Sequence, residues 1–151
     1  MYSKILQSVQ TSIQWESASD VADGAIMTVS FTGRLLPGSA GNELTGHFAD
    51  DLNDIVRTHQ PVGVVLDLTD LDYAFGDAIG ALAYPFLDRV RGGCWAMPVA
   101  IVATGRTAAA LAPLFEPNWI LGAIGAQLFG GRDAAIAYIR SALSGLSYGR
   151  Q

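Results

Sequence analysis

The stretch VGVVLDLTDLDYAFGDAIGALA, residues 62–83, decides the fold class. It begins with Val62–Leu68, a nearly continuous apolar run that is typical of a strand buried on both faces of a parallel sheet. After the acidic letters DLTDLD comes an apolar segment with helical spacing, which predicts a helix beginning near Asp77. Because a buried strand that leads into a helix needs parallel neighbours, the stretch predicts an α/β protein.

Upstream of this stretch, the sequence predicts two strands and a helix. Apolar and polar residues alternate in Lys4–Trp15 and in Ala25–Gly33, and the polar turn Ser17–Gly24 joins these segments into a hairpin at one edge of the sheet. An irregular link, RLLPGSAGN, then leads to a helix over residues 43–59. That helix ends before Pro61, because proline disfavours helix in the residue before it.

The helix over residues 43–59 is amphipathic. Its apolar face consists of Leu44, Phe48, Leu52, Ile55 and Val56, and its opposite face carries Asp50, Asp51 and Asp54. We expect the apolar face to pack against the sheet and the acidic face to contact water.

Downstream, the pattern of strand and helix repeats. Pro98–Gly105 predicts a second buried strand, and Thr107–Phe115 predicts a short helix with Thr107 as its N-cap. An alternative for this helix start is an anion site made by backbone amides and Arg106. A short strand within Ala126–Phe129 and a closing helix over residues 131–143 follow. Together the elements predict one mixed sheet layered with helices.

Length and composition favour one apolar domain, residues 1–151, with a substantial core. No apolar run is long enough to span a membrane, and the N-terminus has no apolar core typical of a signal peptide. We therefore expect a cytoplasmic protein. Cys94 is the single cysteine, so the chain forms no internal disulfide.

The charge balance indicates which partners are unsuitable. Nine Lys and Arg residues face fourteen Asp and Glu residues, and the net charge is −5. Nucleic-acid binders neutralise phosphates with a basic patch, which no stretch of this chain supplies. We expect no nucleic-acid partner, whereas the surplus of acid suits a basic face on another protein.

The sequence shows no arrangement typical of catalysis, metal binding or cofactor binding. His47 and His59 have no Ser, Cys or Asp neighbour in a recognisable catalytic pattern. Asp67, Asp70 and Asp72 are closely spaced, but DLTDLD lacks the glycine turn and the distal Glu of a calcium loop, which favours a solvated turn. We expect no catalytic residues, no metal and no cofactor, and therefore no enzyme.

Three stretches resemble the STAS domain family, which includes bacterial anti-anti-sigma factors. In chain order they are GAIMTVSFTGRLLPGSAGNELTGHFADDLND, VGVVLDLTDLDYAFGDAIGALA and AQLFGGRDAAIAYI. The resemblance as a whole covers roughly Gly24 to Leu143, which is most of the chain. The resemblance implies an α/β fold with a STAS-like mixed β-sheet and helices packed mainly on one face. It also implies a regulatory role in bacterial signalling.

The resemblance places a partner-binding loop before the second helix. In phosphorylatable family members, an Asp-Ser pair follows the buried strand, and a partner kinase phosphorylates that Ser. Carried over without gaps, Phe75 lies at the Asp position, Gly76 at the Ser position and Asp77 at the next residue. Glycine has no hydroxyl group, so phosphorylation at position 76 is chemically impossible. The implied loop consists of Tyr73, Ala74, Phe75, Gly76, Asp77 and Ala78.

Several interpretations stay open at the level of sequence. The first is a non-enzymatic module that binds a kinase-like anti-sigma factor or a related regulator, with homodimerisation and phosphorylation of another hydroxyl such as Thr69 unresolved. Asp77 either caps the helix or presents a permanent negative charge to the partner. The alternative is a small-molecule or lipid-binding STAS-like domain, with Phe75 and Trp95 lining a pocket. A small enzyme is the least favoured reading, because no general acid and base pair is evident.

Overall fold

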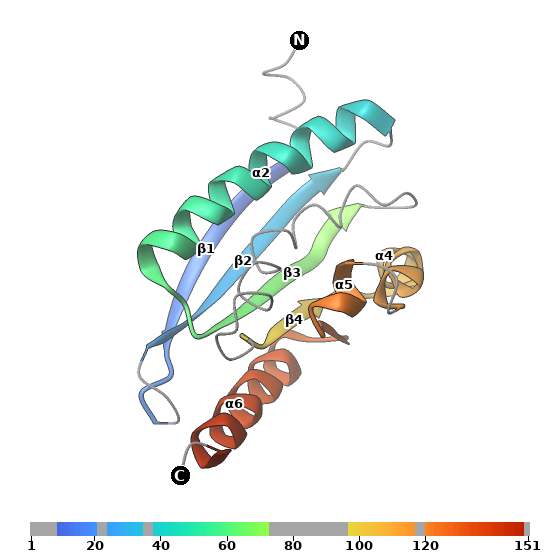
Figure 1. Cartoon of the computed structure of the whole chain (residues 1–151). Coiled ribbons are helices and arrows are strands. Elements are labelled where there is room, and N and C mark those ends of the chain that lie inside the picture. Colours follow the sequence, from blue (N-terminus) through green and yellow to red (C-terminus); the bar gives the residue numbers. More distant parts are fainter. Residues whose placement is uncertain (1–8, 21–23, 35–37, 73–96, 117–119, 150–151) are drawn as a thin grey trace.

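The computed structural model describes residues 9–20, 24–34, 38–72, 97–116 and 120–149 (Figure 1). The predicted helix beginning near Asp77 lies outside these ranges. The elements, in chain order, are β1 (Val9–Ser17), β2 (Ala25–Arg34), α2 (Gly38–His59), β3 (Gly63–Asp72), β4 (Val99–Val102), α4 (Gly105–Leu111), the 3-10 helix η2 (Ala112–Phe115), α5 (Ile120–Ala123), β5 (Gln127–Phe129) and α6 (Arg132–Gly149). The predicted strands and helices that fall in the described ranges are present in the same order, whereas the short helix α5 is an element that the sequence analysis did not predict.

The five strands form one mixed sheet in the order β1-β2-β3-β4-β5. β1 and β2 are antiparallel, with Ile13 opposite Val29, and every later pairing is parallel. The predicted hairpin at the edge of the sheet is therefore confirmed. Parallel order follows because a helix separates β2 from β3 and leads the chain back across the sheet.

The two faces of the sheet are covered unequally. α2, α4, η2 and α5 pack on one face through a large cluster that includes Phe31, Leu52, Leu66, Ile101 and Leu121. α6 packs on the other face through a smaller cluster that includes Val65, Ala100 and Ile139. In Figure 1, α2 follows β1 and β2, while α6 lies apart from it beside β4. The mixed sheet with helices mainly on one face is thus confirmed.

β3 is longer than the sequence predicts, and the solvated turn expected at DLTDLD is wrong. The strand continues to Asp72 and contains a bulge. Ser30 pairs with Asp67 and Thr32 pairs with Asp70, so β3 has one more residue than β2 between these two pairs. The extra residue lets both Leu68 and Leu71 enter the core, although they are three residues apart. Three-residue spacing is not the alternation of a regular strand, which explains the wrong prediction.

Three further boundaries differ from the sequence prediction. α2 begins at Gly38 instead of residue 43, so part of the expected irregular link is helical. Each glycine disfavours helix by about 1 kcal/mol, a preference that tertiary context often overrides. α6 continues to Gly149, and β4 ends at Val102. None of the helices in the described ranges combines the length and apolar character that crossing a membrane requires.

Gly63 lets α6 approach β3 closely. A Cβ atom at this position would lie 2.4 Å from Cγ2 of Ile139, a side chain with no exposed surface. Real Cβ contacts are never this short, so any side chain at residue 63 would displace the helix or the strand. The close contact between α6 and the sheet thus depends on a glycine at the start of β3.

We predict that Gly63→Ala lowers the free energy of unfolding by roughly 1–3 kcal/mol, the usual cost of overpacking a core. Gly46→Ala is the matched control, because it lies inside α2 with open space around its Cβ position. It should raise stability by about 0.4–1 kcal/mol, since alanine restricts the unfolded chain. Urea denaturation measures both changes. Equal stability of Gly63→Ala and the wild type would contradict the close packing of α6 on β3.

Candidate functional site

The partner-binding loop implied by the resemblance, Tyr73–Ala78, lies outside the described residues. The structure does describe Asp72, which is the last residue of β3 and directly precedes Tyr73 in the sequence. β2, β3, β4 and β5 run parallel, so their carboxyl ends meet at the same edge of the sheet. Open α/β sheets place their ligand and partner sites at this edge, because the connecting segments converge there.

Contacts from α4 hold the end of β3 in place. The buried Thr107 hydroxyl donates a hydrogen bond to the carbonyl oxygen of Leu71, over 3.0 Å. The guanidinium of Arg106 forms an ion pair with the carboxylate of Asp72, the residue directly before Tyr73. The ion pair is exposed and contributes little to stability. The buried hydrogen bond and the apolar packing of Leu111 in the core therefore attach α4 to β3.

The predicted N-cap role of Thr107 is wrong. α4 begins at Gly105, so Thr107 lies inside its first turn, and Thr104 precedes the helix without a side-chain capping bond. The Thr107 hydroxyl is instead used between elements, as the bond to β3 shows. Arg106, considered above for anion binding, contacts Asp72.

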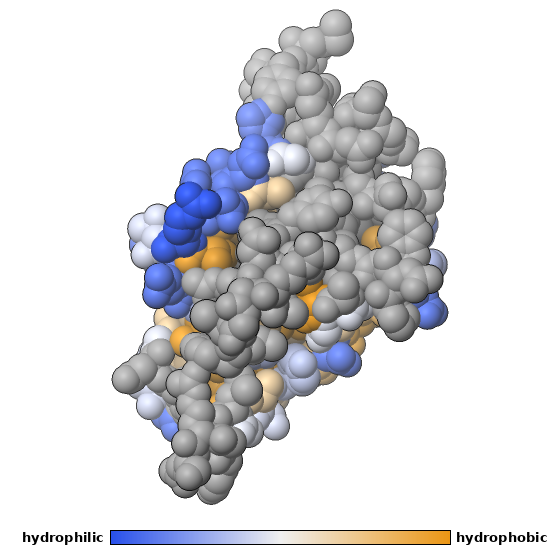
Figure 2. All heavy atoms as spheres, viewed as in Figure 1, coloured by the Kyte–Doolittle hydropathy of each residue, from blue (hydrophilic) through white to orange (hydrophobic). Residues whose placement is uncertain are grey.

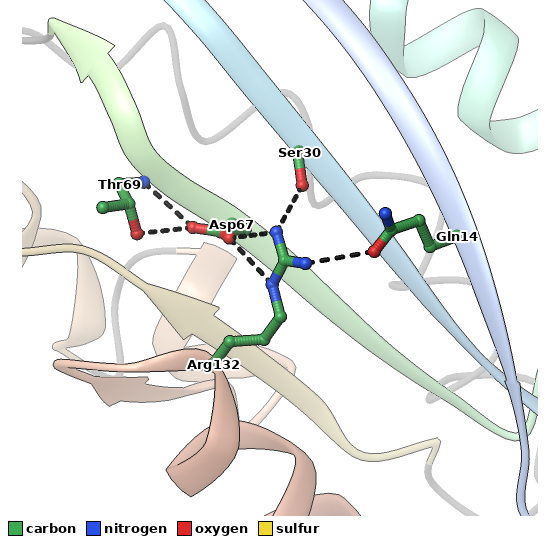
Figure 3. A network of polar contacts seen from close by, with 5 residues as sticks. All are labelled: Gln14, Ser30, Asp67, Thr69 and Arg132. Atoms are coloured by element: carbon green, nitrogen blue, oxygen red, sulfur yellow. Dashed lines mark hydrogen bonds and ion pairs between the residues drawn. The ribbon is translucent and has the colours of Figure 1, made fainter.

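A polar network surrounds Asp67 on the face of the sheet that α6 covers (Figure 3). The Oδ1 atom of Asp67 accepts hydrogen bonds from the backbone N–H of Thr69, over 3.0 Å, and from its hydroxyl, over 2.6 Å. Oδ2 accepts from Nε and Nη2 of Arg132, over 3.1 and 2.6 Å. The same guanidinium donates to Gln14 over 3.0 Å and to Ser30 over 2.9 Å. The network therefore joins β1, β2, β3 and the start of α6.

The environment of Asp67 keeps its carboxylate charged. Burial by itself would raise the pKa, because it disfavours the ionised form. The hydrogen bonds from Thr69 and the hydrogen bonds and charge of Arg132 outweigh burial, so the pKa of Asp67 lies below its ordinary value of 3.8. Each oxygen already accepts two hydrogen bonds. This arrangement suits a fixed structural anion and does not suit a group that exchanges protons at neutral pH.

The three closely spaced aspartates do not form a common site. Asp67 contacts Arg132 on the α6 face, whereas Asp72 contacts Arg106 at the end of the strand. Asp70 lies exposed beside the bulge. In the part of the chain that the structure describes, no three His, Cys, Asp or Glu side chains gather in a way that could hold a metal ion.

Sequence reasoning missed the partners of Asp67. Two of the four hydrogen bonds to Asp67 are local, since Thr69 lies two residues later in the chain. Sequence reasoning did not connect Asp67 with Arg132, which lies 65 residues later. A signal was present, since a carboxylate inside an apolar strand is rarely buried without a cationic partner. The sequence could not say which arginine would supply the charge.

Comparison with known proteins identifies the fold. No family model matches the chain, and no curated protein sequence does. The structure is similar to the crystal structure of an anti-sigma factor antagonist from Mycobacterium paratuberculosis, with a TM-score of 0.55 and 15% sequence identity. The similarity covers 87% of this chain and 95% of that chain. The chain therefore has an α/β STAS-like fold, as the resemblance in sequence predicted.

We predict that Asp67→Asn lowers the free energy of unfolding by roughly 1–3 kcal/mol at neutral pH, because hydrogen bonds to a charged group are lost. A carboxyl whose pKa is depressed by folding stabilises the protein above its unfolded pKa and loses that contribution as pH falls through the folded pKa. The difference in the free energy of unfolding between wild type and variant should thus be constant near neutral pH and should shrink below pH 3.8. Urea denaturation across this pH range measures it.

Asp50→Asn is the control for this measurement, because Asp50 is an exposed residue of α2. It should change stability by less than about 0.5 kcal/mol, as most exposed substitutions do. A difference between wild type and Asp67→Asn that grows as pH falls below 3.8 would contradict a depressed pKa for Asp67.

Proposed function

We propose that the chain is a non-enzymatic regulator of the anti-anti-sigma type that works by binding a protein. The observation that carries this proposal is the similarity to an anti-sigma factor antagonist, because it extends over most of both chains. An anti-sigma factor antagonist acts against an anti-sigma factor. By analogy, the partner of this chain is a kinase-like anti-sigma factor or a related regulator, and the two proteins bind in the cytoplasm.

The partner-binding loop in this proposal is Tyr73–Ala78. Its chemistry follows from the residues themselves: Gly76 offers no hydroxyl group for phosphorylation, and Asp77 supplies a carboxylate beside it. The loop departs from the end of β3, which Thr107 and Arg106 of α4 hold in place. A fixed point of departure lowers the entropy that the loop loses on binding, which favours affinity.

The described polar groups support binding over catalysis. Asp67 is the least exposed carboxylate of the described residues, and its pKa is lowered by four hydrogen bonds and the charge of Arg132. A general base works best with a pKa near the operating pH, which this environment opposes. The acidic net charge further suits a partner with a basic face.

The proposal predicts that Asp77→Arg abolishes capture of the partner. The tagged 151-residue chain is expressed in the organism that encodes it, and captured proteins are identified by mass spectrometry. Wild-type chain should retrieve a kinase-like or sigma-related protein, and Asp77→Arg should retrieve at least tenfold less, because the substitution reverses a charge within the contact. Asp50→Arg makes the same charge change on the exposed side of α2 and should retrieve as much as wild type.

Gly76→Ser gives the second arm of this experiment. If the retrieved partner is a kinase, it should transfer one phosphate group from ATP to residue 76 of this variant and none to residue 76 of the wild type. Retrieval of the same partner by wild type, Asp77→Arg and Gly76→Ser in equal amounts, with no phosphate added to the variant, would overturn the assignment of the loop.

A further inference from the structure

An apolar groove lies between α2 and the edge of the sheet formed by β1 and β2. Its volume is about 310 Å³, and its apolar lining includes Ile13 and Val29 from the sheet and Phe48, Leu52 and Ile55 from α2. Figure 2 shows the hydrophilic residues that cover the outer surface of α2. A groove of this kind accepts apolar side chains from another molecule.

Within the described residues, no strand pairs with the outward side of the β1 backbone along the same groove. Ala18 donates its backbone N–H to Gly24, and the two residues are opposite each other in the β1–β2 hairpin. Because hydrogen-bonded pairs alternate in an antiparallel ladder, the even-numbered residues of β1 bond to β2. Thr11, Ile13 and Trp15 therefore direct their N–H and C=O groups outward. Among the described strands, β1 has β2 as its single neighbour.

Within the described residues, β1 lacks three features that commonly protect an edge strand: proline, lysine and a bulge. Its sequence, VQTSIQWES, contains no proline and no lysine, and its register with β2 continues without a bulge from Val9 to Ser17. Natural edge strands are commonly blocked by such features, because a free edge accepts further strands. Trp15 is also 43% exposed, with its ring 5.2 Å from that of His59 at the end of α2. Exposed tryptophan is typical of binding surfaces.

Two carboxylates give this groove a negative rim. Asp51 and Asp54 belong to its lining, and both are exposed. Within the described residues, neither takes part in an ion pair. Asp51 lies on the same side of α2 as Phe48 and Ile55, at helical spacing, so the expectation that Asp51 lies on the opposite face of the helix is wrong. Basic side chains at this rim would find uncompensated negative charge.

We propose that the β1 edge and the α2 groove form a docking surface for an extended segment of a partner protein. The segment adds a strand beside β1, inserts apolar side chains into the groove and directs basic side chains to Asp51 and Asp54. Main-chain hydrogen bonds supply affinity in strand addition, and the side-chain pockets supply specificity. This surface is separate in sequence from Tyr73–Ala78 and does not depend on the role proposed for that loop.

An extended segment fits the surface better than other occupants. A small molecule would leave the outward N–H and C=O groups of β1 unused. A second copy of this chain, paired through its own β1, would bring Glu16 as its one charged residue and no cation for Asp51 and Asp54. Charge complementarity therefore favours a basic segment from a different protein.

Hydrogen exchange followed by NMR tests the backbone contact in the wild-type protein. The probe is a short synthetic peptide in which every second residue is threonine. The residues between the threonines are lysine and valine in turn, so that both lie on one face of the extended peptide. Its binding should slow exchange at the outward amides of Thr11, Ile13 and Trp15 by at least tenfold at saturation. The amides of Ser12 and Gln14 already bond to β2 and should change far less.

Thr11→Pro removes one outward N–H without removing a bond to β2, which is the position where edge strands tolerate proline. It should weaken peptide binding about tenfold while circular dichroism shows a folded protein. The double variant Asp51→Lys/Asp54→Lys should weaken binding roughly fivefold and should strengthen binding of the peptide with glutamate in place of lysine. Asp50→Lys is the control, because Asp50 is exposed and does not belong to the groove lining.

Three results would overturn the proposal. The first is unchanged exchange at Thr11, Ile13 and Trp15 with saturating peptide. The second is binding of 4-phenylbutylamine that depends on Asp51 while the peptide does not bind, which would assign the groove to small organic cations. The third is a concentration-dependent dimer that Thr11→Pro abolishes, which would assign the edge to a second copy. An Asp77→Arg variant that still captures the partner would contradict the proposed loop, but it would leave these three tests of the β1 edge unchanged.

Discussion

Asp67 places a carboxylate in the middle of β3, between buried apolar neighbours. A buried charge without partners costs several kcal/mol, so this position demands a cation and further hydrogen-bond donors. Arg132, at the start of α6, supplies the cation, and its remaining donors reach Gln14 and Ser30. One electrostatic requirement therefore connects the closing helix with three strands. The position of α6 over the sheet follows from it together with the close approach at Gly63.

The bulge in β3 serves the same requirement and also shapes the end of the strand. Thr69 lies within it and supplies two of the four hydrogen bonds to Asp67. The bulge also brings Leu71 into the core, and the carbonyl oxygen of Leu71 accepts the bond from Thr107. Asp72, the residue before Tyr73, thus ends a strand that a hydrogen bond from α4 holds in place.

The unequal covering of the sheet connects the two proposed surfaces. α2 packs on β1 and β2 through its apolar face yet leaves a groove open toward the edge of the sheet. The proposed partner-binding loop follows β3 in sequence, at the carboxyl ends of the parallel strands and not along the edge strand β1. Under the two proposals, one partner binds the loop and another adds a strand to β1. Both surfaces carry acidic residues, which is consistent with the net charge of −5.

Local patterns determined much of the fold. The alternation in β2 and the apolar run in β3 predicted an edge hairpin and a buried parallel strand, because strand periodicity is readable in a few residues. The absence of a hydroxyl at Gly76 is likewise a property of sequence alone, and the role of the loop around it stays a prediction.

Tertiary structure decided what depends on residues distant in the chain. DLTDLD continues as a strand because a bulge lets both of its leucines pack in the core, and Gly38 is helical despite its low propensity. The pairing of Asp67 with Arg132 and the groove between β1 and α2 arise only when segments far apart in sequence meet. Periodicity reports which face of an element is apolar, whereas packing chooses which charges and which edges come together.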